Sequence, residues 1–271
     1  MFNKEITIAI TSCGRFESLK KTIKSIEQTI DLTLYEKILT EDSKDENHIE
    51  KMKEANNSGF LKGWKIIYTG GANQKDFYKC HYYALKTLYD NISTKYVFHC
   101  EDDQIFKKTN FDYMRLSYNI LESSQDIGIV LLRDLFKDFG LKKTGLMKSR
   151  YYELLTDDET ELFGHNFIYL NKNDSFTLQP GLRRLSEMKE MMFGFEDYVD
   201  EKLIGNRFNN KGLKTIVINP GIFNHINPVF NSTKNIKNMG LTKYIYETLK
   251  GTIKYRGGLV IKYIEDFIIK K

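Results

Sequence analysis

The stretch that sets the fold is ITIAITSCGRFESLKKTIKSI, residues 6–26. Its first six residues, ITIAIT, alternate isoleucine with threonine or alanine, which is typical of a strand, and Ser12-Cys13-Gly14 stop that strand. Leu19, Ile23 and Ile26 then recur at the spacing of a helix. A strand followed at once by an amphipathic helix predicts the first unit of a sheet covered by helices.

The same alternation continues through the first half of the chain. Further strands are expected at residues 37–40, 64–68, 95–100 and 127–132, with helical patterns between them. Five strands alternating with helices predict an α/β domain with a mostly parallel sheet, because parallel neighbours need crossover connections. For the second half we expect a strand pair at 167–170 and 176–178, a helix opened by Pro180, a helix over 195–209 and a strand at 215–218.

Composition places the chain among globular proteins. Of its 271 residues, 41% are hydrophobic and 28% charged, which excludes wholesale disorder. Cys13, Cys80 and Cys100 have no disulfide or zinc-site spacing, which favours a reducing compartment. No apolar run approaches the roughly 18 residues of a membrane span, and the first residues lack the features of a signal peptide. We therefore expect a cytoplasmic protein.

Positive charge is concentrated at the end of the chain. The net charge is +5, and residues 234–271 alone carry nine Lys and Arg against three Asp and Glu. Six apolar residues of this tail share one helical face: Leu259, Val260, Tyr263, Ile264, Phe267 and Ile268. We expect an α/β domain over residues 1–230 and a basic helical extension over 231–271. The extension either lies on an anionic membrane surface or packs on the domain or on a second subunit, as in a homodimer. No nucleic-acid motif accompanies the lysines, so no nucleic-acid partner is expected.

Polar clusters follow three of the predicted strands where each strand ends. They are residues 11–15, residues 41–45 and the triplet Glu101-Asp102-Asp103. Because open α/β sheets bind ligands outside the carboxyl ends of their strands, these clusters are candidates for a site. Three consecutive carboxylates repel one another unless a cation compensates, and oxygen ligands suit Mg²⁺ or Mn²⁺. The alternative is a solvated acidic turn that binds nothing.

Five segments, in the order in which they occur along the chain, resemble the family 2-type glycosyltransferases of the GT-A fold. Residues 6–26 are similar to the opening of that family, and YVFHCEDDQIF (residues 96–106) resembles its acidic metal-binding motif in a Glu-Asp-Asp variant. Asp42 resembles its nucleotide-contacting aspartate. DEKLIGNRFNNKG (residues 200–212) and Asn224-His225-Ile226 resemble its second acidic pair and its late histidine segment. The resemblance implies a GT-A-like fold: a mixed, mostly parallel sheet flanked by helices.

The resemblance also implies a set of ligand-binding residues. The donor would be a nucleotide sugar, with a UDP-sugar favoured, and Asp103 would be the direct ligand of Mn²⁺ or Mg²⁺. Glu101 or Asp102 would reach the metal through water, or the donor ribose, and His225 would be an additional ligand. Such a metal would neutralise the charge that develops on the diphosphate. The full set of predicted donor contacts is Thr11, Ser12, Arg15, Asp42, Glu101 and Asp102.

Inverting transfer needs a base that takes the proton of the acceptor hydroxyl. The match of Gly205-x-Arg207 puts Asp200-Glu201 in register with the family's base, with Glu201 as the base itself. The family more often has aspartate at the base position, and Asp197, in the preceding acidic pair, is the other candidate for the base. Alternatively, both acids belong to an exposed acidic helix face and have no catalytic role.

Two further expectations concern side chains outside the base region. The arginine pair 183–184 could lie beside a phosphate or the acceptor. The histidines at 81 and 99 are expected to pack in the core.

The hypothesis is a metal-dependent, inverting glycosyltransferase that moves a sugar to a hydroxyl group of a glycan or lipid-linked saccharide. Two alternatives stay open. A metal-dependent sugar nucleotidyltransferase would share the sheet, but it usually has a Gly-rich basic loop after its first strand, where this chain has only Gly14. A non-catalytic protein that binds a membrane or a partner through its tail is the other alternative.

Overall fold

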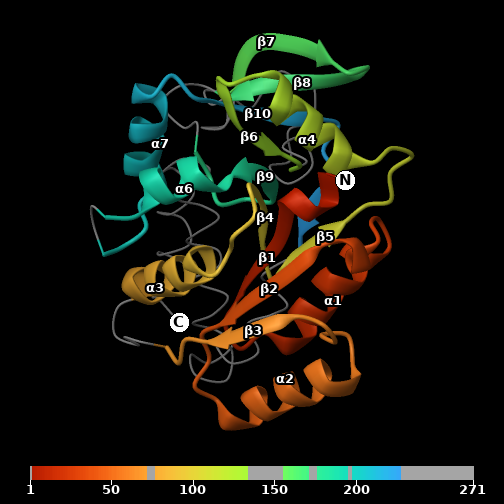
Figure 1. Ribbon diagram of the computed structural model, residues 1–271, viewed down its shortest axis with the longest axis vertical. Helices are drawn as coiled ribbons and strands as arrows, with labels where there is room; N and C mark the ends of the chain where they lie inside the picture. Colours follow the sequence, from red (N-terminus) through yellow and green to blue (C-terminus); the bar gives the residue numbers. More distant parts are fainter. Residues whose placement is uncertain (1, 72–76, 134–154, 171–175, 195–196, 227–271) are drawn as a thin grey trace, which may run out of the picture. The chain divides into compact units, whose positions relative to one another are not determined.

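The computed structural model describes residues 2–71, 77–133, 155–170, 176–194 and 197–226. One compact unit spans Met1–Ile226. Its centre is a nine-stranded sheet with the strand order β3-β2-β1-β4-β9-β6-β10-β8-β7 (Figure 1). The first four of these strands run parallel to one another: β3 (Lys65–Tyr68), β2 (Glu36–Glu41), β1 (Ile6–Ser12) and β4 (Tyr96–Glu101). This arrangement confirms the predicted α/β fold.

The second half of the sheet mixes parallel and antiparallel pairs. β9 (Gly181–Arg184) lies antiparallel between β4 and β6 (Ile127–Leu131), and β10 (Lys214–Asn219) is parallel to β6. β8 (His165–Leu170) and β7 (Leu155–Leu162) continue the sheet as an antiparallel pair.

Two elements expected around Pro180 are wrong. The residues after it form β9 instead of a helix, and residues 176–178 lie in an irregular segment before that strand. A side chain at Gly181 would come within 2.5 Å of the Val130 carbonyl oxygen. Glycine therefore lets this backbone enter the sheet beside β6, and that fit depends on residues distant in the sequence.

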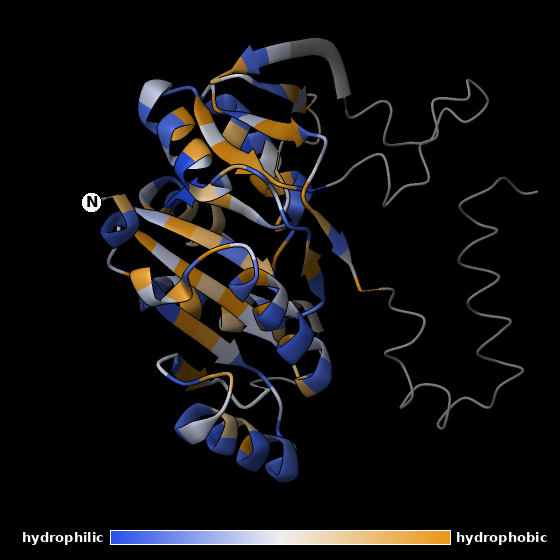
Figure 2. Cartoon of the chain, turned by 90° about the vertical axis from the view of Figure 1, so that its right-hand side faces the viewer, coloured by the Kyte–Doolittle hydropathy of each residue, from blue (hydrophilic) through white to orange (hydrophobic). Residues whose placement is uncertain are grey.

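Helices cover both faces of the sheet. α1 (Phe16–Glu27), α2 (Glu46–Ser58) and α4 (Tyr113–Ser123) belong to one apolar cluster, whereas α3 (Phe77–Asp90), α6 (Leu185–Met192) and α7 (Glu201–Asn210) belong to the other. The side chains of β1 alternate between them, since Ile8 and Ile10 pack in the first cluster and Ala9 in the second. Figure 2 shows strongly hydrophobic strands between these layers and a largely hydrophilic α2 at the bottom of the view.

A second, two-stranded sheet pairs the last strand of the unit with a short strand from the middle of the sequence. β11 (Phe223–His225) pairs antiparallel with β5 (Gln104–Phe106), which directly follows the acidic triplet. The Ile226 N–H donates to the Asp103 carbonyl oxygen at 2.6 Å. Residues 224–226 therefore lie beside the triplet, although more than a hundred positions separate them in the sequence.

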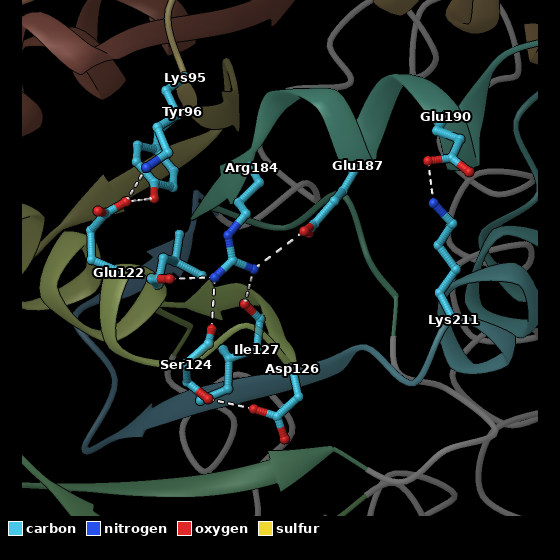
Figure 3. Close-up of polar contacts among 11 residues, drawn as sticks. Lys95, Tyr96, Glu122, Ser124, Asp126, Ile127, Arg184, Glu187, Glu190 and Lys211 are labelled. Atoms are coloured by element: carbon cyan, nitrogen blue, oxygen red, sulfur yellow. Dashed lines mark hydrogen bonds and ion pairs between the residues drawn. The ribbon is translucent and has the colours of Figure 1, made fainter.

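Arg184 joins the end of α4 to β6 and α6 (Figure 3). Its side chain is buried, and its guanidinium donates to the Ile127 carbonyl oxygen at 2.6 Å, to the Ser124 carbonyl oxygen at 2.7 Å and to the Leu121 carbonyl oxygen. Glu187 lies 3.4 Å from the same group. Because the last carbonyls of a helix lack partners within the helix, Arg184 replaces the solvent that would otherwise satisfy them.

Within the ranges described, no helix is long and apolar enough to cross a membrane. The predicted C-terminal extension falls on residues 231–271, which lie outside the described residues, so the two-domain division stays a prediction.

Candidate active site

Three strand ends meet at the carboxyl edge of β1, β2 and β4. The register pairs Ser12 with Glu41 of β2 and Thr11 with Glu101 of β4. The segments that follow these strands therefore leave the sheet close together, and the structure brings together the three polar clusters that the sequence places at strand ends. Thr11 itself is buried inside β1, between Thr40 and Glu101.

Asp102 is a buried carboxylate that holds the loop after β1. Its Oδ2 accepts hydrogen bonds from Ser12 Oγ at 2.9 Å and from the Cys13 N–H at 3.3 Å, while Oδ1 forms an ion pair with Arg15. Burial, together with the neighbouring Asp103, raises the pKa of Asp102 to about 6, although Arg15 and the two hydrogen bonds oppose that shift. Asp102 thus ties the loop between β1 and α1 to the end of β4.

Arg15 bridges the two aspartates of the triplet. It stands at the start of α1, after Gly14, whose φ of +68° suits glycine. One guanidinium nitrogen contacts Asp102 and the other lies 3.0 Å from Asp103 Oδ2. Asp103 Oδ1 accepts a hydrogen bond from Gln104 Nε2 at 2.8 Å. The Arg15 side chain is 39% exposed, so this buried acidic pair is joined to a cation that solvent can reach.

Glu41 and His48 form a second support that the sequence does not reveal. Glu41 Oε1 accepts hydrogen bonds from the N–H groups of Gly14 at 2.8 Å and Ser43 at 2.9 Å, and His48 Nε2 lies 3.0 Å from Glu41 Oε2. Burial alone would raise the pKa of Glu41, but the hydrogen bonds from His48 and Gly14 outweigh it and the pKa is lowered. Glu41 therefore holds the Gly14 turn, and so the start of the helix that carries Arg15.

Asp42 lies between the ends of β2 and β3. Its Oδ1 accepts hydrogen bonds from Thr69 Oγ1 at 2.6 Å and from the Gly71 N–H at 2.9 Å. His81 on α3 is within electrostatic reach of this aspartate: burial lowers the pKa of His81, the Asp42 charge raises it, and Arg15 lowers it. The sequence assigns His81 to the core, whereas the structure places it near the candidate site.

The three acids of the predicted base region have different local partners. Asp200 caps α7, since its side chain accepts hydrogen bonds from the N–H groups of Lys202 and Leu203 at 2.9 and 3.1 Å. Exposed Asp197 pairs with Lys79 of α3 at 2.5 Å, and that hydrogen bond lowers the pKa of Asp197.

Glu201 reaches across to the segment before β9. Its Oε1 accepts hydrogen bonds from the Leu178 N–H at 2.7 Å and from Thr177 Oγ1 at 3.1 Å. Pro180, at the end of that segment, bonds through its carbonyl oxygen to the N–H of Leu132, at the carboxyl end of β6. Glu201 therefore lies on the same edge of the sheet as the acidic triplet.

The two arginines suggested as phosphate ligands are used inside the fold. Arg183 is fully buried: its guanidinium lies 3.0 Å from His99 Nδ1 and donates to the carbonyl oxygens of Thr177 and Gln179. Arg184 binds the carbonyls at the end of α4, as described above. A phosphate role for either is wrong, because each guanidinium is buried and already bonded to groups inside the fold. His99 is buried, as expected, and burial lowers its pKa, with Arg183 adding to the effect.

The predicted metal ligands meet only in part. The backbone of His225 pairs with Gln104, beside Asp103, but its side chain lies outside the described residues. Where the structure describes side chains, no group of three or more His, Cys, Asp and Glu residues is arranged to hold a metal ion. Asp102 and Asp103 both face Arg15 instead. With Arg15 in this position, Asp102 and Asp103 do not by themselves offer a divalent cation a free pair of carboxylate groups.

The Asp102→Asn variant is expected to change how stability depends on pH. Because the folded-state pKa of Asp102, about 6, lies above its usual 3.8, the native protein binds this proton more tightly than the unfolded chain does. This residue's contribution to stability is therefore greatest at low pH and falls as pH rises toward 6. Between pH 4.5 and 7.5 the unfolding free energy of Asp102→Asn should rise relative to wild type by about 2 kcal/mol. Urea denaturation at both pH values measures the difference, and a constant difference would contradict the shifted pKa.

Comparisons with known proteins bear on the fold. No protein-family profile matches this chain, and no curated protein matches it. Among solved structures, S. aureus TarS 1–349 in complex with UDP-GlcNAc has a TM-score of 0.51 at 12% identity, covering 81% of this chain and 58% of that one. S. aureus TarS 1–349 without a named ligand has a TM-score of 0.49 at 13% identity, covering 83% of this chain and 61% of that one.

This chain spans less than two thirds of the length of either TarS chain. At such low identity the likeness concerns the fold alone. Together with the mixed sheet and its flanking helices, it establishes the GT-A-like α/β fold that the sequence predicts.

Proposed function

We propose that this protein is a glycosyltransferase that binds a UDP-sugar at the carboxyl edge of β1, β2 and β4. The sugar would pass to a hydroxyl group of a glycan or a lipid-linked saccharide. The observation that carries the proposal is the contact of the loop after β1 with Asp102 and Asp103 at the ligand-binding edge of a GT-A-like sheet. The complex of TarS with UDP-GlcNAc supports the choice of a UDP-sugar.

In the proposed reaction, the acceptor oxygen forms a bond to the anomeric carbon of the donor sugar. The bond from that carbon to the diphosphate breaks, UDP leaves with the electron pair, and the acceptor proton passes to a base. Negative charge therefore develops on the diphosphate, and a cation at its position would stabilise the transition state. The proposed donor contacts are Thr11, Ser12, Arg15, Asp42, Glu101 and Asp102.

The proposed metal site combines carboxylates of the acidic triplet with the late histidine. Asp103, Glu101 and His225 stay the predicted ligands of Mn²⁺ or Mg²⁺, which would supply Lewis-acid stabilisation of the leaving diphosphate. In the described arrangement the cation that contacts the acidic pair is Arg15, so a metal ion would first have to displace it.

Glu201 is the base that we propose for an inverting transfer. Its Oε1 is held against the segment before β9, whereas Asp197 is exposed and paired with a surface lysine. Because positioned bases contribute roughly 10²–10⁴-fold, Glu201→Gln should slow transfer by at least about a hundredfold, whereas Asp197→Asn should leave the rate within about threefold. Glu190→Gln is the matched control, since Glu190 forms an exposed ion pair with Lys211 and has no proposed role in the site. A large loss in Asp197→Asn with full activity in Glu201→Gln would move the base to Asp197.

The proposed activity is tested by release of the nucleoside diphosphate. The full chain is incubated with UDP-, GDP-, CMP- and dTDP-sugars, with saccharide acceptors and with Mn²⁺, Mg²⁺ or EDTA, and free nucleotide is measured over time. We expect acceptor-stimulated release from one UDP-sugar. Binding without acceptor-stimulated release for every donor would contradict the transferase proposal, and formation of a nucleotide sugar from a nucleoside triphosphate would favour the nucleotidyltransferase.

The cellular setting follows from the tail and stays a prediction. A cytoplasmic enzyme at the inner face of a membrane would suit a lipid-linked acceptor, and residues 231–271 would supply the contact. A homodimer through the same segment is the alternative.

A further inference from the structure

Each carboxylate oxygen of Asp102 and Asp103 already contacts a hydrogen-bond donor or a guanidinium. Asp102 Oδ2 accepts from Ser12 and Cys13, and its Oδ1 contacts Arg15. Asp103 Oδ1 accepts from the Gln104 amide at 2.8 Å, and its Oδ2 lies 3.0 Å from Arg15. A divalent cation needs carboxylate oxygens that face it without a competing positive group. Two of the four oxygens face a guanidinium instead.

The guanidinium is held in place by its surroundings as well as by charge. The Gly14 N–H and the Ser43 N–H are both bound by Glu41, which fixes the turn before Arg15, and Asp102 fixes the same turn through Ser12. Asp102 is fully buried and Asp103 is 9% exposed, so solvent screens their attraction to Arg15 only weakly. The Arg15 side chain is 39% exposed, so a ligand arriving from solvent can reach the guanidinium.

From these contacts we infer that Arg15 is the resident cation of the acidic pair and that it excludes divalent cations from it while the site is free of nucleotide. The inference deepens the proposed function, because it concerns the same site, but it can be tested without any nucleotide. A donor diphosphate would compete with the two aspartates for the guanidinium. A metal ion could reach Asp103 only once Arg15 has been drawn away.

If Arg15 keeps divalent cations away from Asp103, replacing Arg15 with a neutral residue should create a metal site. Arg15→Gln removes a positive charge about 3 Å from Asp103, and the repulsion between that charge and Mn²⁺ disappears with it. We expect the variant to bind Mn²⁺ at least about tenfold more tightly than wild type in the absence of nucleotide. Electron paramagnetic resonance of free Mn²⁺, titrated with the full chain, measures both affinities directly.

Three further variants control the measurement. Arg115→Gln removes an exposed arginine of α4 that pairs only loosely with Asp112, at 3.8 Å, so it should bind Mn²⁺ as wild type does. Arg15→Lys keeps the charge and should keep Mn²⁺ out, which separates loss of charge from loss of the side chain. In the double variant Arg15→Gln with Asp103→Asn, the gained affinity should disappear if Asp103 is the ligand that Arg15 covers.

Equal Mn²⁺ affinity in wild type and Arg15→Gln would overturn the inference, whether both bind tightly or neither binds. Circular dichroism and the melting temperature of each variant show that the fold is retained. Failure of the proposed function gives a different pattern, namely no UDP-sugar binding in any variant alongside a clear difference in Mn²⁺ affinity.

Discussion

Replacing Asp103 by alanine is expected to lower the rate of sugar transfer by roughly 100–1000-fold while the protein stays folded. Asp103 is the more exposed aspartate of the triplet, and its Oδ2 holds one arm of Arg15 at 3.0 Å. Without it the cation that meets the diphosphate loses its orientation, and so does any metal ion that replaces Arg15. Steady-state kinetics with the active UDP-sugar measure the loss, which should appear in kcat/KM.

Asp126→Ala is the matched control for this variant. Asp126 precedes β6 and so lies at the amino edge of the sheet, where it pairs with Lys214 at 2.7 Å with both side chains about half exposed. Its loss should leave transfer within about twofold, because an exposed ion pair contributes little. Full activity in Asp103→Ala would show that the acidic triplet is a structural turn and would contradict the assignment of the site.

The second large effect is expected on stability, at Arg184. Arg184→Met keeps the apolar stem but leaves the carbonyl oxygens of Leu121, Ser124 and Ile127 without their shared donor. Because buried acceptors without partners are costly and Glu187 also loses its cation, unfolding free energy should fall by about 3–5 kcal/mol. Urea denaturation at neutral pH measures the change, which should appear as a lower midpoint with an unchanged slope.

Lys211→Met is the comparison for Arg184, and Figure 3 shows both residues. Lys211 pairs with Glu190, and the two side chains are 39% and 56% exposed. Its loss should change stability by less than about 1 kcal/mol. A similar small loss in Arg184→Met would mean that water satisfies the end of α4 as well as the guanidinium does.

Much of the fold could be predicted because its signals are local. The strand–turn–helix pattern from Ile6 onward repeats along the first half, and α1, α2 and β1 to β4 lie where periodicity puts them. The acidic clusters were predictable for the same reason, since each directly follows a strand. Their meeting at one edge follows from the parallel register of those strands.

The remaining features depend on pairs that are distant in the sequence. β9 enters the sheet because Gly181 fits against Val130, which no local pattern records. His48 lies in a largely polar helix, and its burial depends on distant partners, Glu41 and the ring of Phe16. The ion pairs of Arg15 likewise depend on how closely two separate strand ends approach, so the sequence alone did not reveal that a guanidinium contacts both aspartates.

Binding of UDP-GlcNAc to the full chain tests the central claim most directly. At a hundred times its dissociation constant the donor should stabilise the protein by about 2.7 kcal/mol, which corresponds to a rise in melting temperature on the order of 5–10 °C. The account predicts such a rise for a UDP-sugar and its loss in Asp103→Ala. No rise with any nucleotide sugar, with or without Mn²⁺, would contradict a donor site at this edge of the sheet.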